Sequence, residues 1–466
     1  MFRQSFFFIL SVLSLFTLSI SCNENEEVTP TTTVEDLSEV TLETSEKSVS
    51  ELRSTLQENG LLMHEEMQKM SDTKTADALV SFINISENAE IESSEGSSPT
   101  VFITPVIKAI DGNSTLEEIG QSMRSLQAPE EDDDDFSTFK ALWNDFRGTT
   151  LTYDALEDDF NETENDLNKF QILFPLVEGG SNNVVFSIDE FTSHVVTNAD
   201  IKEDLEVTEP DFDFPKSLKA SLTIDGTLEM SYSINIAYGS DDIPTALSTT
   251  TFINPFTIST SFSNDGEELR TSLAFVNGET NIYSYLASLQ GDVSWNSIDQ
   301  ASQMEEPDPL KLESAYFQIS LFDVALRTTA SNIEGMVNDI TEIDDNYDYG
   351  YEIMRDSARA AAQEVKYAAD MEKVIDDHIA FDLFFISDGE KIADTKIEVI
   401  PQLNDSYCFN SGVDEICTYN FFSEPDLTMT FADGGIMTAE EFVEVGFETL
   451  ESAFEDLFDD LDEDFD

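Results

Sequence analysis

Two cysteines near the end of the chain have the spacing of a cross-strand disulfide. Eight residues separate Cys408 from Cys417, and Gly412 lies in the middle of them, as in the connection of a β-hairpin. In an exported protein, a cysteine pair that flanks a turn predicts a disulfide. Closing so short a loop adds about 2.5–3 kcal/mol on the chain-entropy model. The alternative is a pair of free thiols.

A second candidate is a calcium-binding loop. Asp344, Asn346 and Asp348 alternate as the ligands of such a loop do. The EF-hand pattern requires Gly at its sixth position and Glu at its twelfth, which are Tyr349 and Arg355 here. We therefore expect at most weak Ca²⁺ or Mg²⁺ binding, and the alternative is a solvated loop ahead of the next helix.

Signatures of catalysis are mostly absent from the sequence. The three histidines, His64, His194 and His378, lie too far apart for an H-E-x-x-H zinc site. There is no nucleophile elbow, no phosphate-binding loop and no dinucleotide fingerprint. Carboxylates are so numerous that no pair stands out as an acid and base. The sequence thus favours a non-enzymatic protein without a cofactor, and a hydrolase acting on glycans stays as a minor alternative.

The first residues have the pattern of a secretory signal peptide. Arg3 precedes an apolar and serine-containing stretch from Phe6 to Ile20, which is shorter than the roughly 20 apolar residues of a membrane span. Residues 1–21 are therefore expected to be a signal peptide, followed by a polar, acidic tether over residues 22–36.

Cys22 is the expected site of lipidation. The segment Leu18–Cys22 resembles a bacterial lipobox, in which the cysteine is acylated and becomes the mature N-terminus; Leu18 stands one place earlier than that pattern has it. Several acyl chains on one residue would give stable membrane anchoring. The acidic run after Cys22 resembles the surface-export tract of Bacteroidota-type lipoproteins, which implies an outer-membrane protein facing the cell exterior. The alternative is an ordinary signal peptide with an incidental cysteine.

The charge balance excludes several classes of partner. The chain has 466 residues, with 22 Lys and Arg against 97 Asp and Glu, for a net charge of −75. This charge argues against nucleic-acid binding and against docking on an anionic membrane through a basic face. Hydrophobic residues make up 40% of the chain and Phe occupies 35 positions, so the chain is not disordered throughout.

Alternation of apolar and polar residues predicts an antiparallel β-meander over residues 138–330. The clearest strand runs from Leu228 to Tyr238 and is preceded by the hairpin turn Asp225-Gly226. Further turns are expected at residues 264–266 and 277–278. Other expected strands are Phe170–Phe174, Val184–Ile188, Phe256–Phe262, Leu269–Phe275 and Ala315–Leu326.

Helical patterns flank this meander. Residues 37–84 predict two N-terminal helices with a break near Gly60, and residues 85–137 a loop and acidic linker. The region 331–466 predicts a helix over Glu352–Lys373, strands at Ile379–Ile386 and Lys396–Ile400, a C-terminal helix and an acidic tail. That last helix opens with a capping box from Thr438 to Glu441. An apolar stripe at helical spacing follows it, formed by Val443, Phe447, Leu450, Phe454 and Leu457.

The predicted fold class is therefore α+β. We expect a large, curved antiparallel sheet packed by N-terminal and C-terminal amphipathic helices.

Several short motifs carry a resemblance to a known group. They are the segment Phe146–Tyr153 with its Gly-Thr strand, Phe174-Pro175, the hairpin from Leu218 to Tyr238, and Asp388–Asp394. Together they resemble an uncharacterised group of Bacteroidota lipoproteins over residues 140–400, although the first strand lacks the aromatic-rich run of that group. The resemblance implies surface localisation and a β-rich body, and it implies no activity.

The expected function is that of a lipid-anchored binding or structural module at the cell surface, with an extracellular ligand or protein partner that the sequence does not identify. The alternative is a carrier of lipid or another apolar molecule in a groove of the curved sheet. Met230, Tyr232 and Phe262 are the residues expected to line such a groove.

Overall fold

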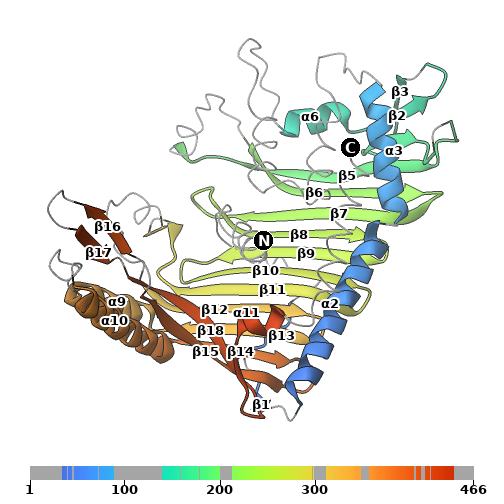
Figure 1. Cartoon of the computed structure of the whole chain (residues 1–466). Helices are drawn as coiled ribbons and strands as arrows, with labels where there is room; N and C mark the ends of the chain where they lie inside the picture. Colours follow the sequence, from blue (N-terminus) through green and yellow to red (C-terminus); the bar gives the residue numbers. More distant parts are fainter. Residues whose placement is uncertain are drawn as a thin grey trace. The chain divides into compact units, whose positions relative to one another are not determined.

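The structure is a computed structural model that describes residues 34–444, apart from 39, 45–46, 72, 89–138, 158, 178, 200–212, 296, 299–310, 348–355, 404–405, 411–414 and 420. Within this part the fold is α+β, dominated by an open, mainly antiparallel β-sheet (Figure 1). The chain divides into two compact units. Unit 1 contains residues 66–265 and 270–281, and unit 2 contains residues 34–65, 266–269 and 282 onward.

Unit 1 is built on a run of antiparallel neighbours from β4 to β9, with β2 pairing antiparallel to β3 and parallel to β4. Its strands are β2 (Thr149–Asp154), β3 (Asp159–Glu164), β4 (Phe170–Phe174), β5 (Val184–Val195), β6 (Asp213–Ile224), β7 (Thr227–Tyr238), β8 (Pro244–Ile253) and β9 (Phe256–Asn264), and β10 (Glu268–Asn277) lies mostly in it. Its described helices include α3 (Lys74–Asn88) and α6 (Phe139–Phe146).

The core of unit 1 lies between one sheet face and these two helices. Phe82 of α3 packs against Phe174 of β4, with the ring centroids 5.2 Å apart, and Trp143 of α6 lies 6.3 Å from Phe191 of β5. Both contacts belong to one cluster of buried side chains that extends to Met230 on β7. Burial of these aromatic residues stabilises this unit.

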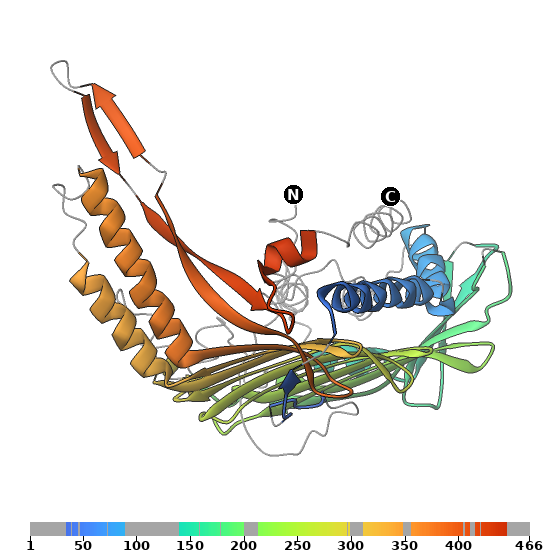
Figure 2. The ribbon, with the colours of Figure 1, turned by 60° about the horizontal axis from the view of Figure 1, so that its bottom comes forward.

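Unit 2 has a second run of antiparallel neighbours, in the order β11 (Thr280–Gly291), β12 (Leu312–Leu321), β13 (Val324–Ser331), β14 (Ile379–Phe385), β15 (Glu390–Gln402), β18 (Phe422–Thr430) and β19 (Ile436–Thr438). The short β1 (Glu43–Thr44) pairs parallel with β15. The helices α9 (Ile333–Asn346) and α10 (Ser357–His378) lie side by side, and the separate hairpin of β16 (Ser406–Asn410) and β17 (Glu415–Tyr419) projects beyond their ends (Figure 2).

Two helices cover the core of unit 2. Leu52, from the first part of α2 (Val49–Ser71), and Phe442, from α11 (Ala439–Glu444), are almost fully buried against side chains such as Phe385. Both helices begin with a capping box. Glu441 and Thr438 exchange side-chain-to-backbone hydrogen bonds of 3.0 and 3.1 Å, which confirms the predicted cap, and Ser48 and Glu51 make the equivalent pair for α2.

Most of the predicted strands and turns are present. Asp225 and Gly226 both have positive φ, at 52° and 78°, as the type I′ turn of a two-residue hairpin requires. Phe170–Phe174 forms β4 and Leu228–Tyr238 lies within β7. The predicted strand at Val184 is longer than expected and ends at Val195.

Three predictions about elements were wrong. Gly60 does not interrupt α2, which ends only at Ser71, and Leu37 lies in irregular chain rather than in a helix. The segment Ala315–Leu326 is not one strand, because β12 ends at Leu321 and β13 begins at Val324. The helix expected over Glu352–Lys373 is present as α10, which begins at Ser357 and continues to His378. The linker expected from residue 85 begins later, because α3 continues to Asn88; the rest of that linker and the C-terminal stripe beyond Val443 lie outside the described residues.

Candidate functional site

A polar site in unit 2 holds residues 34–44, a segment ahead of α2 that we term the strap. Arg327 of β13 is only 9% exposed, and its Nη1 donates to the backbone carbonyls of Leu37, Ser38 and Val40 at 2.7, 3.2 and 3.2 Å. Asp382 of β14, the registered neighbour of Arg327, accepts from its Nε and Nη2 at 3.2 and 2.8 Å. The Asp382 carboxylate thus orients the guanidinium, and Nη1 donates its hydrogen bonds to the backbone of the strap.

Gln318 of β12 binds the same segment through both ends of its amide. Its Oε1 accepts from the Leu37 N–H at 3.0 Å, and its Nε2 donates to the Glu35 carbonyl at 2.9 Å. The Tyr316 hydroxyl donates to the same Oε1 at 2.6 Å and so orients the amide. Gln318 is 1% exposed, and a buried amide is tolerated only when its hydrogen bonds are made, as they are here.

A small apolar cluster completes the strap site. Leu37 is 2% exposed and packs with Ala325 and Phe384, both fully buried. The strap then forms β1, whose Glu43 N–H donates to the Gly389 carbonyl at 2.9 Å. Gly389 has a φ of 69°, and a Cβ there would stand 2.8 Å from the Thr41 carbonyl oxygen. The turn therefore requires glycine for both its conformation and its contact with the strap.

The charges around the strap site are balanced. Lys391 of β15 forms ion pairs with Asp382 at 3.1 Å and with Asp394 at 3.2 Å. Burial opposes the positive charge of Lys391, but the hydrogen bonds and charges of these two carboxylates outweigh it and raise its pKa. Asp382 thus lies between two cations, Arg327 and Lys391, in a protein that has few of them.

Unit 1 contains a histidine–carboxylate pair at one end of its strands. His194 Nε2 lies 2.8 Å from Asp242, whose carboxylate also accepts hydrogen bonds from Thr197 and from the Asn198 N–H. Burial opposes ionisation of Asp242, but these hydrogen bonds outweigh it and lower its pKa to about 2. The imidazole stacks on Tyr238, with ring centroids 4.3 Å apart. This arrangement joins the end of β5 to the β7–β8 turn.

That pair resembles part of a catalytic triad, but the described residues do not supply a complete one. The hydrogen bonds of Asp242 go to His194 and to the backbone and hydroxyl of a neighbouring loop, as in a turn-stabilising carboxylate. Thr197 is bonded to Asp242 itself and not to the imidazole. We therefore interpret His194 and Asp242 as structural.

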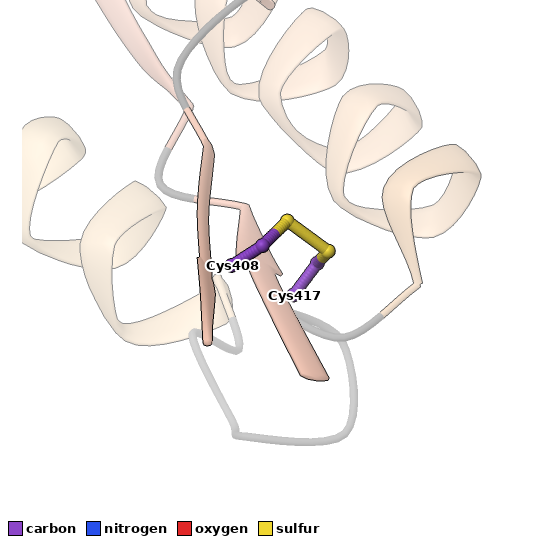
Figure 3. The surroundings of a disulfide bond; sticks show 2 residues. All are labelled: Cys408 and Cys417. Atoms are coloured by element: carbon purple, nitrogen blue, oxygen red, sulfur yellow. A yellow bond between two sulfur atoms is a disulfide. The ribbon is translucent and has the colours of Figure 1, made fainter. Parts of the chain in front are cut away.

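The predicted disulfide is present. Cys408 and Cys417 are a registered pair of β16 and β17 with a Cα–Cα distance of 4.0 Å, and their sulfurs are bonded (Figure 3). The disulfide closes a two-stranded sheet that has no further strand beside it among the described residues. Such a hairpin is marginally stable alone, so the covalent link has a clear structural purpose.

The three residues expected to line a groove lie on one face of unit 1. Met230 is fully buried in the core cluster, and Tyr232 packs against that cluster while burial raises its pKa to about 12. Phe262 is partly buried and forms a registered pair with Leu247, which also touches the cluster. The arrangement brings the three onto one surface, with Met230 inside the core and Phe262 at its margin.

The expected calcium ligands are not arranged as a loop. Asp344 and Asn346 belong to the last turn of α9, and Asp348 lies outside the described residues. Two residues apart in a helix, their side chains point about 200° from each other. Asp344 accepts a hydrogen bond from the Tyr367 hydroxyl, and Asn346 donates to the Glu342 carbonyl. In the described part of the chain, no three His, Cys, Asp or Glu residues are grouped closely enough to hold a metal ion.

The sequence did not predict Arg327 and Gln318 as site residues. The available signal was a single arginine in an otherwise uncharged strand and a single glutamine among apolar neighbours. Cys22, the expected lipidation site, lies outside the described residues. Among the helices of the described residues, none is long and apolar enough to cross a membrane.

The chain was also compared with known proteins. No family model, no curated protein and no solved structure matches it.

Proposed function

We propose that this protein is an exported lipoprotein, anchored through acylated Cys22 to the outer membrane and acting as a non-enzymatic binding or structural module on the cell exterior. The observation that carries the proposal is the Cys408–Cys417 disulfide. Disulfides persist in oxidising compartments outside the cytoplasm, which agrees with the signal-peptide pattern of residues 1–21.

The strap site also supports an anchored role. A polar site in unit 2, built from buried side chains, grips the segment that follows the expected tether. In this proposal the N-terminal and C-terminal amphipathic helices cover one face of a curved sheet, which leaves the acidic exterior and the loops for an extracellular ligand or partner.

Metabolic labelling tests the anchor. Cells that express the wild type, Cys22→Ser or Cys408→Ser/Cys417→Ser are grown with an alkyne fatty acid, and the purified protein is examined for label. We expect label on the wild type and on the double variant, and none on Cys22→Ser. Equal labelling of Cys22→Ser would refute the lipid anchor. Protease treatment of intact cells then reports whether the body faces the exterior.

A carrier of lipid or another apolar molecule is the second candidate. Its support is the margin of the unit 1 core, where Phe262, Leu247 and Ile258 stay partly accessible on the face that carries Tyr232. Native mass spectrometry of the protein would reveal a bound lipid. Loss of that lipid in Phe262→Asp, but not in Ser263→Asp on the opposite face, would favour the carrier, whereas bare wild-type protein would contradict it.

A further inference from the structure

The strap site binds its segment mainly through the backbone. Gln318 and Arg327 contact amide and carbonyl groups of residues 35–40, and Leu37 is almost fully buried, more than any other strap side chain whose burial is described. Both polar side chains are themselves at least nine-tenths buried. A buried arginine and a buried amide would lose most of their hydrogen bonds without the strap, so the bound state is strongly preferred.

The strap fixes the chain at a point well before α2. Leu37 lies fifteen residues after Cys22, whereas Val49, the first residue of α2, lies twenty-seven residues after it. At about 3.3–3.6 Å per residue, the longest reach from Cys22 is about 50–54 Å to Leu37 and about 90–97 Å to Val49. Binding of the strap therefore removes nearly half of the greatest distance that the chain could span.

We propose that binding of the strap shortens the tether, and so keeps the strap-bearing face of unit 2 close to the membrane that holds Cys22. This inference rests on the proposed lipid anchor. The strap lies on one face of the sheet strands of unit 2 and α11 lies on the other, as β1 and α11 show in Figure 2. The face that carries Gln318 and Arg327 is thus the membrane-proximal one, and α11 is on the side directed away from the lipid.

Two matched insertions test whether the bound strap limits the length of the tether. A twelve-residue Gly/Ser insert is placed either within residues 23–33, ahead of the strap, or between Ser45 and Glu46, after it. Each full-length lipoprotein also carries Ser357→Cys, an exposed position at the start of α10. Because Cys22 is acylated and Cys408 is bonded to Cys417, the new cysteine is the one free thiol and takes a donor dye. The proteins are reconstituted into phosphatidylcholine vesicles that contain an acceptor-labelled lipid.

We expect the insert ahead of the strap to reduce energy transfer to the lipid, and the insert after it to leave transfer unchanged. In Gln318→Ala/Arg327→Ala, which weakens the strap site, the second insert should reduce transfer as well. Equal reduction by both inserts with the site intact would overturn this proposal, since the bound strap would then not limit the length of the tether. A protein that fails to float with the vesicles would instead contradict the anchor, and the proposed function with it.

Discussion

Gln318 and Arg327 face each other as a registered pair across β12 and β13, and together they bind both polarities of one backbone segment. Gln318 accepts from the Leu37 N–H, and Arg327 donates to the Leu37 carbonyl. The side chains of two adjacent strands thus make the hydrogen bonds to the strap backbone that the backbone of a neighbouring strand would make in a sheet. The site depends on the register of this strand pair, because a shift of either strand by one residue would turn its side chain to the opposite face and separate Gln318 from Arg327.

Replacement of Arg327 should strongly destabilise unit 2. Arg327→Met removes the donors to three strap carbonyls and leaves Asp382 with Lys391 as its remaining cation. We expect a loss of about 3 kcal/mol in the free energy of unfolding, typical of breaking a buried ion pair. Denaturant titration followed by circular dichroism measures it. Lys373→Met, which removes an exposed ion pair with Asp377, is the control and should have no measurable effect.

The strap site shows why part of the structure could not be predicted. The turn between β12 and β13 is made by Phe322, which has a φ of 48°, with Asp323 after it. Bulky residues rarely adopt positive φ, so the sequence offers no turn signal and reads as one strand. Once the turn is known, Leu321 pairs with Val324. Three residues further along each strand, Gln318 then pairs with Arg327. Tertiary contacts, such as the hydrogen bond from the Phe322 N–H to Ile282, support the turn instead.

The other outcomes follow the same physics. Asp225-Gly226, the capping box at Thr438 and the cysteine pair are local signals, and local signals predicted their elements correctly. The spacing of Leu37, Val40 and Leu42 predicts the start of a helix, whereas the burial of Leu37 comes from β13 and β14, far along the chain. Gly60 has a low helix propensity, but the packing of Leu52 on the core of unit 2 offsets this loss, so α2 continues past Gly60.

Glycine at position 389 should be needed for the strap as well as for the turn. Gly389→Ala and Gly434→Ala both place a Cβ at positive φ, at 69° and 83°, and each should lose about 1 kcal/mol for that reason. Only at Gly389 does the Cβ meet the strap, at 2.8 Å from the Thr41 carbonyl oxygen. We expect Gly389→Ala to be the more destabilising variant in urea titrations, and faster hydrogen exchange of the Glu43 amide. Similar losses in both variants would contradict a close contact with the strap.

The stability of unit 1 should depend on pH through Asp242. Its folded pKa is about 2, below the ordinary value of 3.8, so the stabilisation is complete above about pH 4 and is lost as the pH falls through 2. The shift corresponds to about 2 kcal/mol. Wild type and Asp242→Asn should therefore differ in free energy of unfolding most at pH 5 and much less at pH 2. A difference that does not vary between these pH values would show that Asp242 is not specifically stabilised as a carboxylate.

The net charge of −75 should make stability depend on salt. Self-repulsion destabilises the compact state, and added cations screen it. We expect the melting temperature to rise from low ionic strength to that of seawater, with Mg²⁺ or Ca²⁺ effective at lower concentration than Na⁺. A constant melting temperature over this range would contradict the screening argument. A saturating Ca²⁺ effect that is removed by Asp344→Asn/Asp348→Asn would indicate a specific site instead.

Reduction of the disulfide should affect the β16–β17 hairpin and leave the rest of unit 2 intact. The Cys408–Cys417 link closes a two-stranded sheet of its own, and a loop of this length gains about 2.5–3 kcal/mol from closure. Among the described residues the hairpin pairs with no strand of the main sheet, so we expect its opening to leave the core unchanged. In Cys408→Ala/Cys417→Ala we expect the backbone amides of residues 406–410 and 415–419 to lose their protection against hydrogen exchange. The melting temperature and the protection of β15 and β18 should stay at wild-type values. If protection of β15 and β18 fell together with that of the hairpin, the hairpin would be coupled to the body, and the disulfide would contribute to the stability of unit 2 as a whole.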